Sequence, residues 1–372
     1  MNNDFESKQE INNIFLLDLG SSLTKIGFSS NIYPSIICDS SYGIPRIHDA
    51  GNNLEKTQKI YCEDLNNSTI SIKRINLFTY SQPNNLESIF EFVEHLFNKM
   101  SLPTKNEGLI IAYSNEWSNF FLYQLQAFLF QRFNFSSILP IKTDFLSLIS
   151  HKVKTGVVLD IGHSYSRVIQ FDKGKPLTTA GFKTNVAGKL IQDYLIKLYN
   201  NSHPYLQSPI FEPLISSIIR EKCLLTFDID KLLSDQYLDE IISEEIEISQ
   251  FKEILMLGIE KYLAPEVLFH PKLANSKNLS VDSLIIQSLK ECHLSLRSKV
   301  YSNIILAGGG CAFKNFKERL LSIFSKIPML ANSNILIHFD PSLTVWKGML
   351  VAANSNYYGK NAQTQNQFFA KL

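Results

Sequence analysis

Short apolar runs with polar breaks open the chain and predict strands joined by hairpins. Residues 14–20 (IFLLDLG), 24–30 (TKIGFSS) and 33–40 (YPSIICDS) are apolar segments that end at Gly or Ser, at the spacing of β-hairpins. The next segment, residues 41–76, is rich in Asn, Asp and Lys. This composition is typical of loops, so it predicts a small, mobile insertion outside the core.

Helical spacing replaces the strand pattern after residue 85. Within residues 86–100 (LESIFEFVEHLFNKM), apolar side chains repeat every three or four positions, as on one face of a helix: Ile89, Phe92, Val93, Leu96 and Phe97. Residues 107–114 predict a buried strand, 119–134 an amphipathic helix, and 136–150 a further short strand and helix. The first 150 residues therefore combine strands with helices.

The strand pattern starts again near residue 155, and this restart repeats the opening. Residues 15–28 (FLLDLGSSLTKIGF) and 157–171 (VVLDIGHSYSRVIQF) each end an apolar strand with Leu-Asp, an apolar residue and Gly. Small polar residues and a base then lead into another apolar strand, and the second copy ends in a hairpin at 172–174. One copy alone favours a hairpin whose turn holds an acid and a base. Two copies favour a pair of phosphate loops that clamp a polyphosphate and its metal.

A run of three glycines marks a third segment with two interpretations. Residues 302–320 (SNIILAGGGCAFKNFKERL) predict a buried strand that ends at 308–310 and is followed by a helix. The glycines allow a flat ligand to approach the backbone closely, or they form only a strand-to-helix turn.

Composition and charge narrow the class of protein. The 372 residues are 45% hydrophobic, which is enough to form a large core. They carry 36 basic and 35 acidic side chains, so the chain lacks the basic excess of a general nucleic-acid binder. Five scattered cysteines without a CxxC pair argue against a zinc site or a disulfide framework and favour a reducing compartment. The polar, acidic N-terminus is unlike a signal or transit peptide, and no apolar run reaches the ~18 residues of a membrane span. We therefore expect a soluble intracellular protein without membrane insertion.

Several ordered motifs resemble the actin family over nearly the whole chain. They are residues 186–198 (VAGKLIQDYLIKL), 258–271 (GIEKYLAPEVLFHP), 283–310 and 344–350 (TVWKGML), together with the two hairpins. The resemblance implies an α/β, actin-like ATPase fold of the sugar-kinase and heat-shock ATPase superfamily, with two similar lobes around a nucleotide cleft. The implied first lobe comprises residues 1–150 and 344–372, with a small subdomain at about 41–76. The second comprises 151–343, with a subdomain at about 187–276.

The resemblance also implies a site for ATP or ADP with Mg²⁺. Asp18 and Asp160 would hold the metal through water, and Lys25 would contact phosphate. The other cofactor-binding positions are the two loops, a small residue beside the nucleotide and the adenosine pocket: Gly20, Ser21, Ser22, Gly162, Gly188, Arg220, Glu221, Gly308, Gly309 and Phe313. The alternative is structural, with turn acids at 18 and 160, a solvated strand Lys at 25 and a core aromatic at 313.

Three positions depart from the family's hydrolytic set. Thr143 stands where the family has a Gln, His163 where it has a second Asp, and Arg167 where it has a His. Thr is too short to reach the attacking water as Gln does, and Mg²⁺ prefers oxygen to the imidazole nitrogen. Leu19 and Ile161 also replace polar donors in the loops. Phosphoryl transfer to water needs a positioned water molecule. We therefore expect that the chain binds nucleotide with little or no hydrolysis and that it has no catalytic residues.

The resemblance favours a structural subunit of a multiprotein complex. The short tail after Trp346 indicates that the family's last helices are shortened or replaced, and the 41–76 insertion lacks an apolar tip. We therefore expect no self-polymerising filament and no sequence-specific nucleic-acid binding, but contacts with other actin-like subunits.

Three features resemble the actin-related branch at the pointed end of the dynactin minifilament: the opening motifs, the absence of the second acid at position 163, and the LDIG motif. This resemblance implies a role in microtubule-based transport and a cytoplasmic, cytoskeletal location. Residues 174–195 also resemble a nuclear branch of chromatin-remodelling complexes. A sugar or acetate kinase of the same fold is a further alternative, disfavoured because no catalytic base is evident near the loops.

Overall fold

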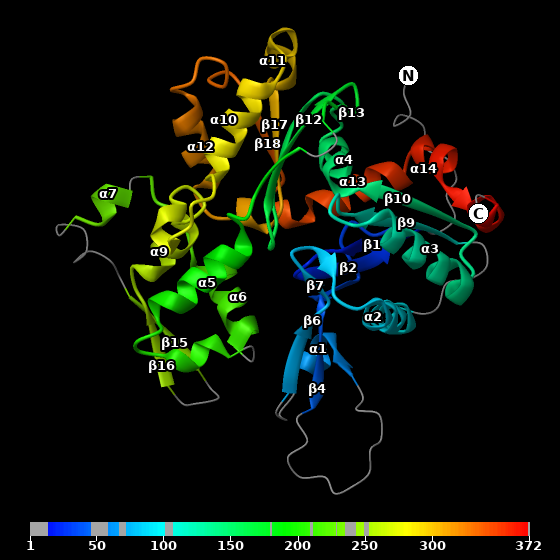
Figure 1. The fold of residues 1–372 in the computed structure, drawn as a ribbon, viewed down its shortest axis with the longest axis horizontal. Coiled ribbons are helices and arrows are strands. Elements are labelled where there is room, and N and C mark those ends of the chain that lie inside the picture. Colours follow the sequence, from blue (N-terminus) through cyan, green and yellow to red (C-terminus); the bar gives the residue numbers. More distant parts are fainter. Residues whose placement is uncertain are drawn as a thin grey trace, which may run out of the picture. The chain divides into compact units, whose positions relative to one another are not determined.

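The computed structural model divides the chain into two compact units, which are described separately. Unit 1 comprises Met1–Val158, Phe171–Ala180 and Leu343–Leu372, and unit 2 comprises Leu159–Gln170 and Gly181–Ser342. The structure describes residues 14–45, 59–66, 72–100, 107–178, 181–208, 211–227, 229–234, 243–248 and 253–370. Figure 1 draws these residues as a ribbon.

A six-stranded sheet with the order β19-β10-β9-β1-β2-β3 forms the centre of unit 1. Strand β9 is parallel to β1 and β10, and the other pairs are antiparallel. The strands are β1 (Ile14–Leu19), β2 (Leu23–Phe28), β3 (Ile36–Asp39), β9 (Gly108–Tyr113), β10 (Ser137–Lys142) and β19 (Gln363–Thr364). The strands and hairpins predicted for residues 14–40 are therefore confirmed.

Both faces of this sheet are buried, which explains the unbroken apolar run of β1. Successive residues of a strand point to opposite faces. Phe15 and Leu17 accordingly belong to one core cluster, whereas Ile14 and Leu16 belong to the other. A strand that is covered on both faces needs apolar residues at every position.

Helices of unit 1 contribute to each of these clusters. The first cluster includes residues of α2 (Leu86–Lys99) and α3 (Asn119–Phe133), and all five apolar positions predicted for the 86–100 helix are fully buried in it. The second cluster includes residues of α4 (Thr143–Ser150) and α13 (Thr344–Ala353). Helices α4 and α13 cross closely, because a Cβ on Gly348 would lie 2.1 Å from the carbonyl oxygen of Leu146. The glycine in TVWKGML is therefore required by helix packing.

The segment after α13 is ordered and completes the first core cluster. It forms α14 (Asn356–Asn361), β19 and α15 (Gln365–Phe369), and a capping box between Thr364 and Gln367 starts α15. Phe368 is buried, with its ring stacked 5.0 Å from that of Tyr123 and tilted 5.3 Å from that of Phe130. The short tail thus forms two short helices and an edge strand.

Part of the 41–76 segment lies in the core, which corrects the prediction of an insertion outside it. Strand β4 (Ser41–Pro45) pairs with β5 (Ile60–Tyr61) and β6 (Ile72–Asn76), and α1 (Cys62–Asn66) follows β5. Tyr42, Tyr61 and Cys62 are buried in the first core cluster. A small sheet with one buried face needs only a few apolar residues to pack into the core. The average composition of residues 41–76 is polar, so it does not reveal these few buried positions. The predicted tip falls within 46–58, which lies outside the described residues, as does 67–71.

A second sheet, most of which belongs to unit 2, has β12 (Ser166–Asp172), β11 (Gly156–Ile161), β17 (Asn303–Ala307) and β18 (Asn334–Ile337) as consecutive neighbours. β14 (Phe182–Thr184) also pairs with β12, and β13 (Lys175–Pro176) forms the predicted hairpin with the end of β12. Gln170 of β12 donates from Nε2 to the carbonyl oxygen of Ser288 at 2.6 Å and to the hydroxyl of Tyr301 at 2.8 Å. This buried network connects the sheet to α10 (Val281–Glu291) and to the residue that follows α11 (Leu294–Val300), so the amide nitrogen has two partners in the core.

The remaining elements complete unit 2 and a hairpin of unit 1 (Figure 1). The unit 2 helices are α5 (Gly188–Leu198), α6 (Glu212–Lys222), α7 (Ile229–Leu232), α9 (Glu260–Glu266), α10 (Val281–Glu291), α11 (Leu294–Val300) and α12 (Phe316–Phe324). Its 3₁₀ helices are η1 (Pro204–Gln207), η3 (Pro271–Ala274) and η4 (Gly309–Cys311), and η5 (Pro341–Leu343) ends at the unit boundary. Strands β15 (Glu244–Ile248) and β16 (Glu253–Leu257) pair in unit 2, and β7 (Phe78–Thr79) and β8 (Gln82–Pro83) pair in unit 1.

The helices that the structure describes include none with the length and apolar character needed to cross a membrane.

Candidate functional site

The β1–β2 hairpin places the acid and the base of the opening motif side by side. Asp18 and Lys25 are direct partners in the antiparallel register, and Lys25 Nζ donates to Asp18 Oδ2 at 3.0 Å. Both side chains are less than a tenth exposed. Burying two charges costs desolvation free energy, which only close pairing and further hydrogen bonds offset. The hairpin therefore places the ammonium group of Lys25 and the carboxylate of Asp18 next to each other near the end of a central strand.

The turn of this hairpin is tightly fixed. The Gly20 N–H donates to the carbonyl oxygen of Leu23 at 3.1 Å, and a Cβ on Gly20 would lie 2.5 Å from that same oxygen. Ser21 and Ser22 follow in the turn and are half-buried. Ser40 also anchors it, because its Oγ donates to the Gly20 carbonyl at 2.6 Å and its N–H donates to the Ser22 carbonyl at 2.8 Å. No sequence motif identifies Ser40, since a single serine at a strand end is not distinctive.

The second loop repeats the hydrogen bond of the first. The Gly162 N–H donates to the carbonyl oxygen of Tyr165 at 3.1 Å, as the Gly20 N–H does to Leu23. Asp160 precedes this turn near the end of β11, at the position that Asp18 has in β1. The repeat seen in the sequence is thus a repeat of backbone geometry. Two such turns, each with an acid two residues before its glycine, are present in the chain.

The start of α5 is attached to the second loop. The N–H of Gly188 donates to the Gly162 carbonyl at 3.0 Å, and the N–H of Lys189 donates to the His163 carbonyl at 2.7 Å. A Cβ on Gly188 would lie 3.1 Å from His163 Cα, so a small residue is needed there. The structure therefore brings Gly162 and Gly188 together within unit 2.

The glycine run contains positions of two kinds. Gly308 has φ +85°, and a Cβ there would lie 2.3 Å from the Ile161 carbonyl oxygen and 2.5 Å from Asp160 Oδ1. A Cβ on Gly310 would lie 2.1 Å from Ile161 Cγ2. Around Gly309, in contrast, nothing lies within 4 Å of an added Cβ. Packing of β17 against β11 thus explains two of the glycines, and only Gly309 faces open space.

The predicted adenosine positions lie on neighbouring segments of unit 2. Arg220 and Glu221 are exposed near the end of α6, and Phe313 is half-buried after η4. Leu224 forms a β-bridge with Lys314, and the Leu225 N–H donates to the Lys314 carbonyl at 3.2 Å. The segment that follows α6 is therefore joined to the segment that follows the glycine run.

The departures from the hydrolytic set lie on elements of both units. Thr143 is the first residue of α4 in unit 1, whereas His163 and Arg167 lie in unit 2. Burial lowers the pKa of His163, with Lys189 acting in the same direction and Glu212 against it, which favours the neutral imidazole at pH 7. The Arg167 guanidinium lies 5.5 Å from the centre of the Tyr165 ring in a buried cation–π contact.

The carboxylates fit a magnesium ion that is held mainly by phosphate and water. In the part of the chain that the structure describes, no cluster of three or more His, Cys, Asp or Glu side chains is arranged to hold a metal. Mg²⁺ usually keeps several waters and takes one or two carboxylates plus substrate phosphates. Within its own unit, Asp18 and Asp160 are each a single carboxylate one residue before the end of a strand. Leu19 and Ile161, which follow them, are buried and offer no side-chain donor.

Comparisons with known proteins give matches that cover most of the chain. The family model described as actin matches residues 9–214 and 240–360. Putative actin-29 of Dictyostelium discoideum is 26% identical over 340 residues, covering 89% of this chain and 83% of that protein. Actin-like protein 7A of Homo sapiens is 22% identical over 357 residues, covering 93% and 79%, respectively. The Rattus norvegicus protein of the same name is 23% identical over 355 residues, covering 93% and 78%.

Proposed function

Because the chain belongs to the actin family and has its α/β fold, we propose that it is a nucleotide-binding structural subunit of a multiprotein assembly, with little or no ATP hydrolysis. The observation that carries the proposal is the repeated turn. Gly20 and Gly162 make the same backbone hydrogen bond at 3.1 Å, each two residues after a strand-end aspartate. Duplicated turns of this kind supply backbone N–H groups and a carboxylate for a polyphosphate with its metal.

The proposal gives the residues of each unit a distinct role. In unit 1, Lys25 would neutralise phosphate and Asp18 would hold Mg²⁺ through a water, so that contacts with the ligand would replace their ion pair. In unit 2, Asp160 would hold Mg²⁺ through a water, and Gly309 leaves space for a flat base to approach the backbone. Bound Mg²⁺ would supply charge neutralisation of the phosphates.

The chemistry of the altered positions argues for binding without turnover. Hydrolysis needs a water held in line with the terminal phosphate by polar side chains. Thr143 has a short side chain. Burial favours the neutral form of His163, so this position offers magnesium an imidazole nitrogen in place of the carboxylate oxygen that it prefers. Arg167 is a cation suited to phosphate but not to activating water.

Magnesium with ATP or ADP is expected to raise the melting temperature of the purified chain. Ligand at a hundredfold excess over its Kd adds about 2.7 kcal/mol to the free energy of unfolding. The ligand-induced shift should shrink strongly in Lys25→Ala and only slightly in Arg220→Ala, because Lys25 is buried in the hairpin and Arg220 is exposed. The shift is measured within each variant, so that a change in basal stability does not enter. An unchanged melting temperature at millimolar ATP would contradict nucleotide binding.

Hydrolysis by the wild-type chain is expected to be far slower than that of a conventional actin measured in parallel. The double variant Thr143→Gln/His163→Asp restores both polar groups and is expected to release phosphate faster than wild type. Phosphate release under single-turnover conditions gives both rates. A wild-type rate equal to that of the conventional actin would overturn the interpretation of Thr143, His163 and Arg167.

For the assembly, we propose dynactin, with this chain at the pointed end of the minifilament and a cytoplasmic, microtubule-linked location. The support is the resemblance of the opening hairpin, of the LDIG motif and of the altered acid position to that branch. A subunit with one surface for an actin-like neighbour and one unusable surface ends a filament. Contacts with actin-like and complex-specific subunits are the corresponding partners.

Affinity purification of the tagged chain from native cells distinguishes the candidate assemblies. Recovery with dynactin subunits supports the proposal, whereas recovery with a remodelling ATPase from nuclei supports the chromatin alternative. Pelleting of the pure protein as long filaments would contradict both assignments. The nucleotide test above is independent of this result, since binding does not depend on the complex.

A further inference from the structure

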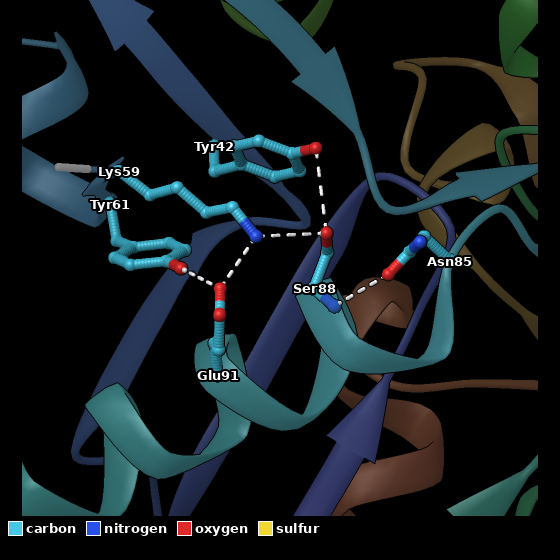
Figure 2. Close-up of polar contacts among 6 residues, drawn as sticks. All are labelled: Tyr42, Lys59, Tyr61, Asn85, Ser88 and Glu91. Carbon is cyan, nitrogen blue, oxygen red and sulfur yellow. Dashed lines mark hydrogen bonds and ion pairs between the residues drawn. The ribbon is translucent and has the colours of Figure 1, made fainter. Parts of the chain in front are cut away.

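Lys59 and Tyr61, in the segment Lys59–Glu63, contact the first turns of helix α2 (Figure 2). Lys59 Nζ contacts Ser88 Oγ at 3.0 Å and Glu91 Oε2 at 2.5 Å, and it lies 4.8 Å from the centre of the Tyr42 ring. The Tyr61 hydroxyl donates to Glu91 Oε2 at 3.4 Å. These contacts fix the strand that leads into α1.

The same segment is attached to the other end of α2 at Glu63. Glu63 Oε2 pairs with Lys99 Nζ at 3.2 Å, in the last turn of α2. Cys62 lies between these two anchored ends and has φ +53°, a left-handed conformation that costs free energy for a residue other than glycine. Cys62, in this uncommon backbone conformation, is thus flanked on both sides by residues that contact α2.

This conformation places two thiols together. Cys62 Sγ lies 2.8 Å from Sγ of Cys38, which belongs to β3 of the large sheet. Both cysteines are buried, and both are free thiols in the structure. A disulfide needs a separation of about 2.05 Å, so the sulfurs must approach by less than 1 Å. The other three cysteines, Cys223, Cys292 and Cys311, are also free thiols.

The environment favours one thiolate of the pair. The hydrogen bond between the thiols, with some help from the Lys99 charge, lowers the pKa of Cys62. The same hydrogen bond and burial raise the pKa of Cys38. The thiolate is the nucleophile toward oxidants and disulfides. Cys62 is therefore the first sulfur to react and Cys38 the one that resolves.

We propose that Cys38 and Cys62 form a reversible, peroxide-driven disulfide that locks α1 to β3. The Cys62 thiolate attacks one oxygen of hydrogen peroxide, the O–O bond breaks, and hydroxide leaves, which gives a sulfenic acid at Cys62. The Cys38 sulfur then attacks Cys62 Sγ and displaces that oxygen as water. The two thiols lose two electrons and two protons, and one peroxide becomes two waters. A dithiol reductant reverses the step.

The disulfide changes the unit 1 chain in a defined way. It closes a loop between positions 24 residues apart, and this loop contains β4 and β5. Closing such a loop removes conformational freedom mainly from the unfolded chain. The disulfide then adds a covalent cross-link between β3 of the large sheet and the segment that follows β5 of the small sheet β5-β4-β6, while Lys59 and Glu63 connect this segment to α2. Oxidation therefore restrains the small sheet, independently of nucleotide or of the assembly.

The test uses the full chain treated with hydrogen peroxide, followed by alkylation of free thiols in denaturant and digestion with trypsin. The peptides that carry the two cysteines, Ile26–Arg46 and Ile60–Lys73, are expected as one species. The mass of this linked species is expected to be two hydrogens below the sum of the masses of the two peptides, and dithiothreitol should release the separate peptides. Cys223, Cys292 and Cys311 are expected to be recovered alkylated. Amide hydrogen exchange in β4–β6 should slow in the oxidised form and recover after reduction.

Matched variants make the outcome decisive. Cys38→Ser is expected to accumulate a Cys62 sulfenic acid that a dimedone probe labels, whereas Cys223→Ser retains the linked peptide. Recovery of wild-type Cys38 in alkylated form after peroxide treatment would overturn the proposal. Linkage of either cysteine to another position in the chain would overturn it as well.

Discussion

Replacing Lys25 with methionine is expected to lower the free energy of unfolding by about 3–5 kcal/mol, because it leaves the buried carboxylate of Asp18 without its partner. The pair is direct, with Lys25 Nζ 3.0 Å from Asp18 Oδ2, and water reaches neither side chain freely. Methionine fills much of the volume of lysine, so a cavity contributes little. Urea denaturation followed by circular dichroism gives the difference.

Two controls separate the charge from the packing. The double variant Asp18→Leu/Lys25→Met removes both charges and is expected to recover most of the loss, since a well-packed apolar pair often replaces a buried ion pair without cost. Lys189→Met removes one partner of an exposed pair with Asp193, in which both side chains are about half exposed, and is expected to cost less than about 1 kcal/mol. A Lys25→Met variant as stable as wild type would show that the hairpin does not need the pair.

The double variant also distinguishes the two interpretations of the hairpin. If the ion pair served structure alone, a stable Asp18→Leu/Lys25→Met chain would keep its thermal response to magnesium nucleotide. If the pair is held for exchange with a ligand, that response disappears while the fold remains. Stability and ligand response therefore change separately in this one variant.

Local signals in the sequence predicted much of the fold. The 86–100 helix was predicted from five apolar positions, and all five are fully buried in α2. The paired hairpins were predicted from a repeated motif, and the structure gives both turns the same Gly N–H to carbonyl bond. Such features depend on neighbours a few residues away, so periodicity and turn chemistry suffice for them.

The failures involve partners that are distant in the sequence. The core positions of Tyr42 and Tyr61 depend on α2, which lies beyond a long polar stretch, and no local average reveals them. The anchoring of Gly20 by Ser40 likewise joins residues 20 positions apart. The proximity of Cys38 and Cys62 depends on how β3 and α1 pack, and their spacing matches no motif.

Sequence patterns predicted only some features of the candidate positions. Spacing identified the two acids and the glycine run, but it did not separate a glycine needed for ligand from one needed for packing. The structure draws that distinction at Gly308, Gly309 and Gly310 by what an added Cβ would meet. The assignment of Arg220 and Phe313 to an adenosine pocket stays a prediction.

The glycine run gives the second large effect. Gly308→Ala is expected to lower the free energy of unfolding by about 2–4 kcal/mol, as the sum of strain at positive φ and overpacking. The backbone has φ +85°, and the new Cβ would meet a carbonyl oxygen at 2.3 Å, which cannot move aside as a flexible side chain can. Urea denaturation measures the loss.

Gly309→Ala is the matched control, since the same methyl group is added one residue along where nothing lies within 4 Å. Its stability is expected to stay within about 0.5 kcal/mol of wild type. Its thermal response to magnesium ATP should nevertheless fall, because the methyl occupies the space through which a flat base would approach the backbone. A Gly309→Ala chain with full stability and a full nucleotide response would show that the glycine run is a strand-to-helix turn and nothing more. A selective loss of the response would place the ligand against Gly309, since packing gives this glycine no other role.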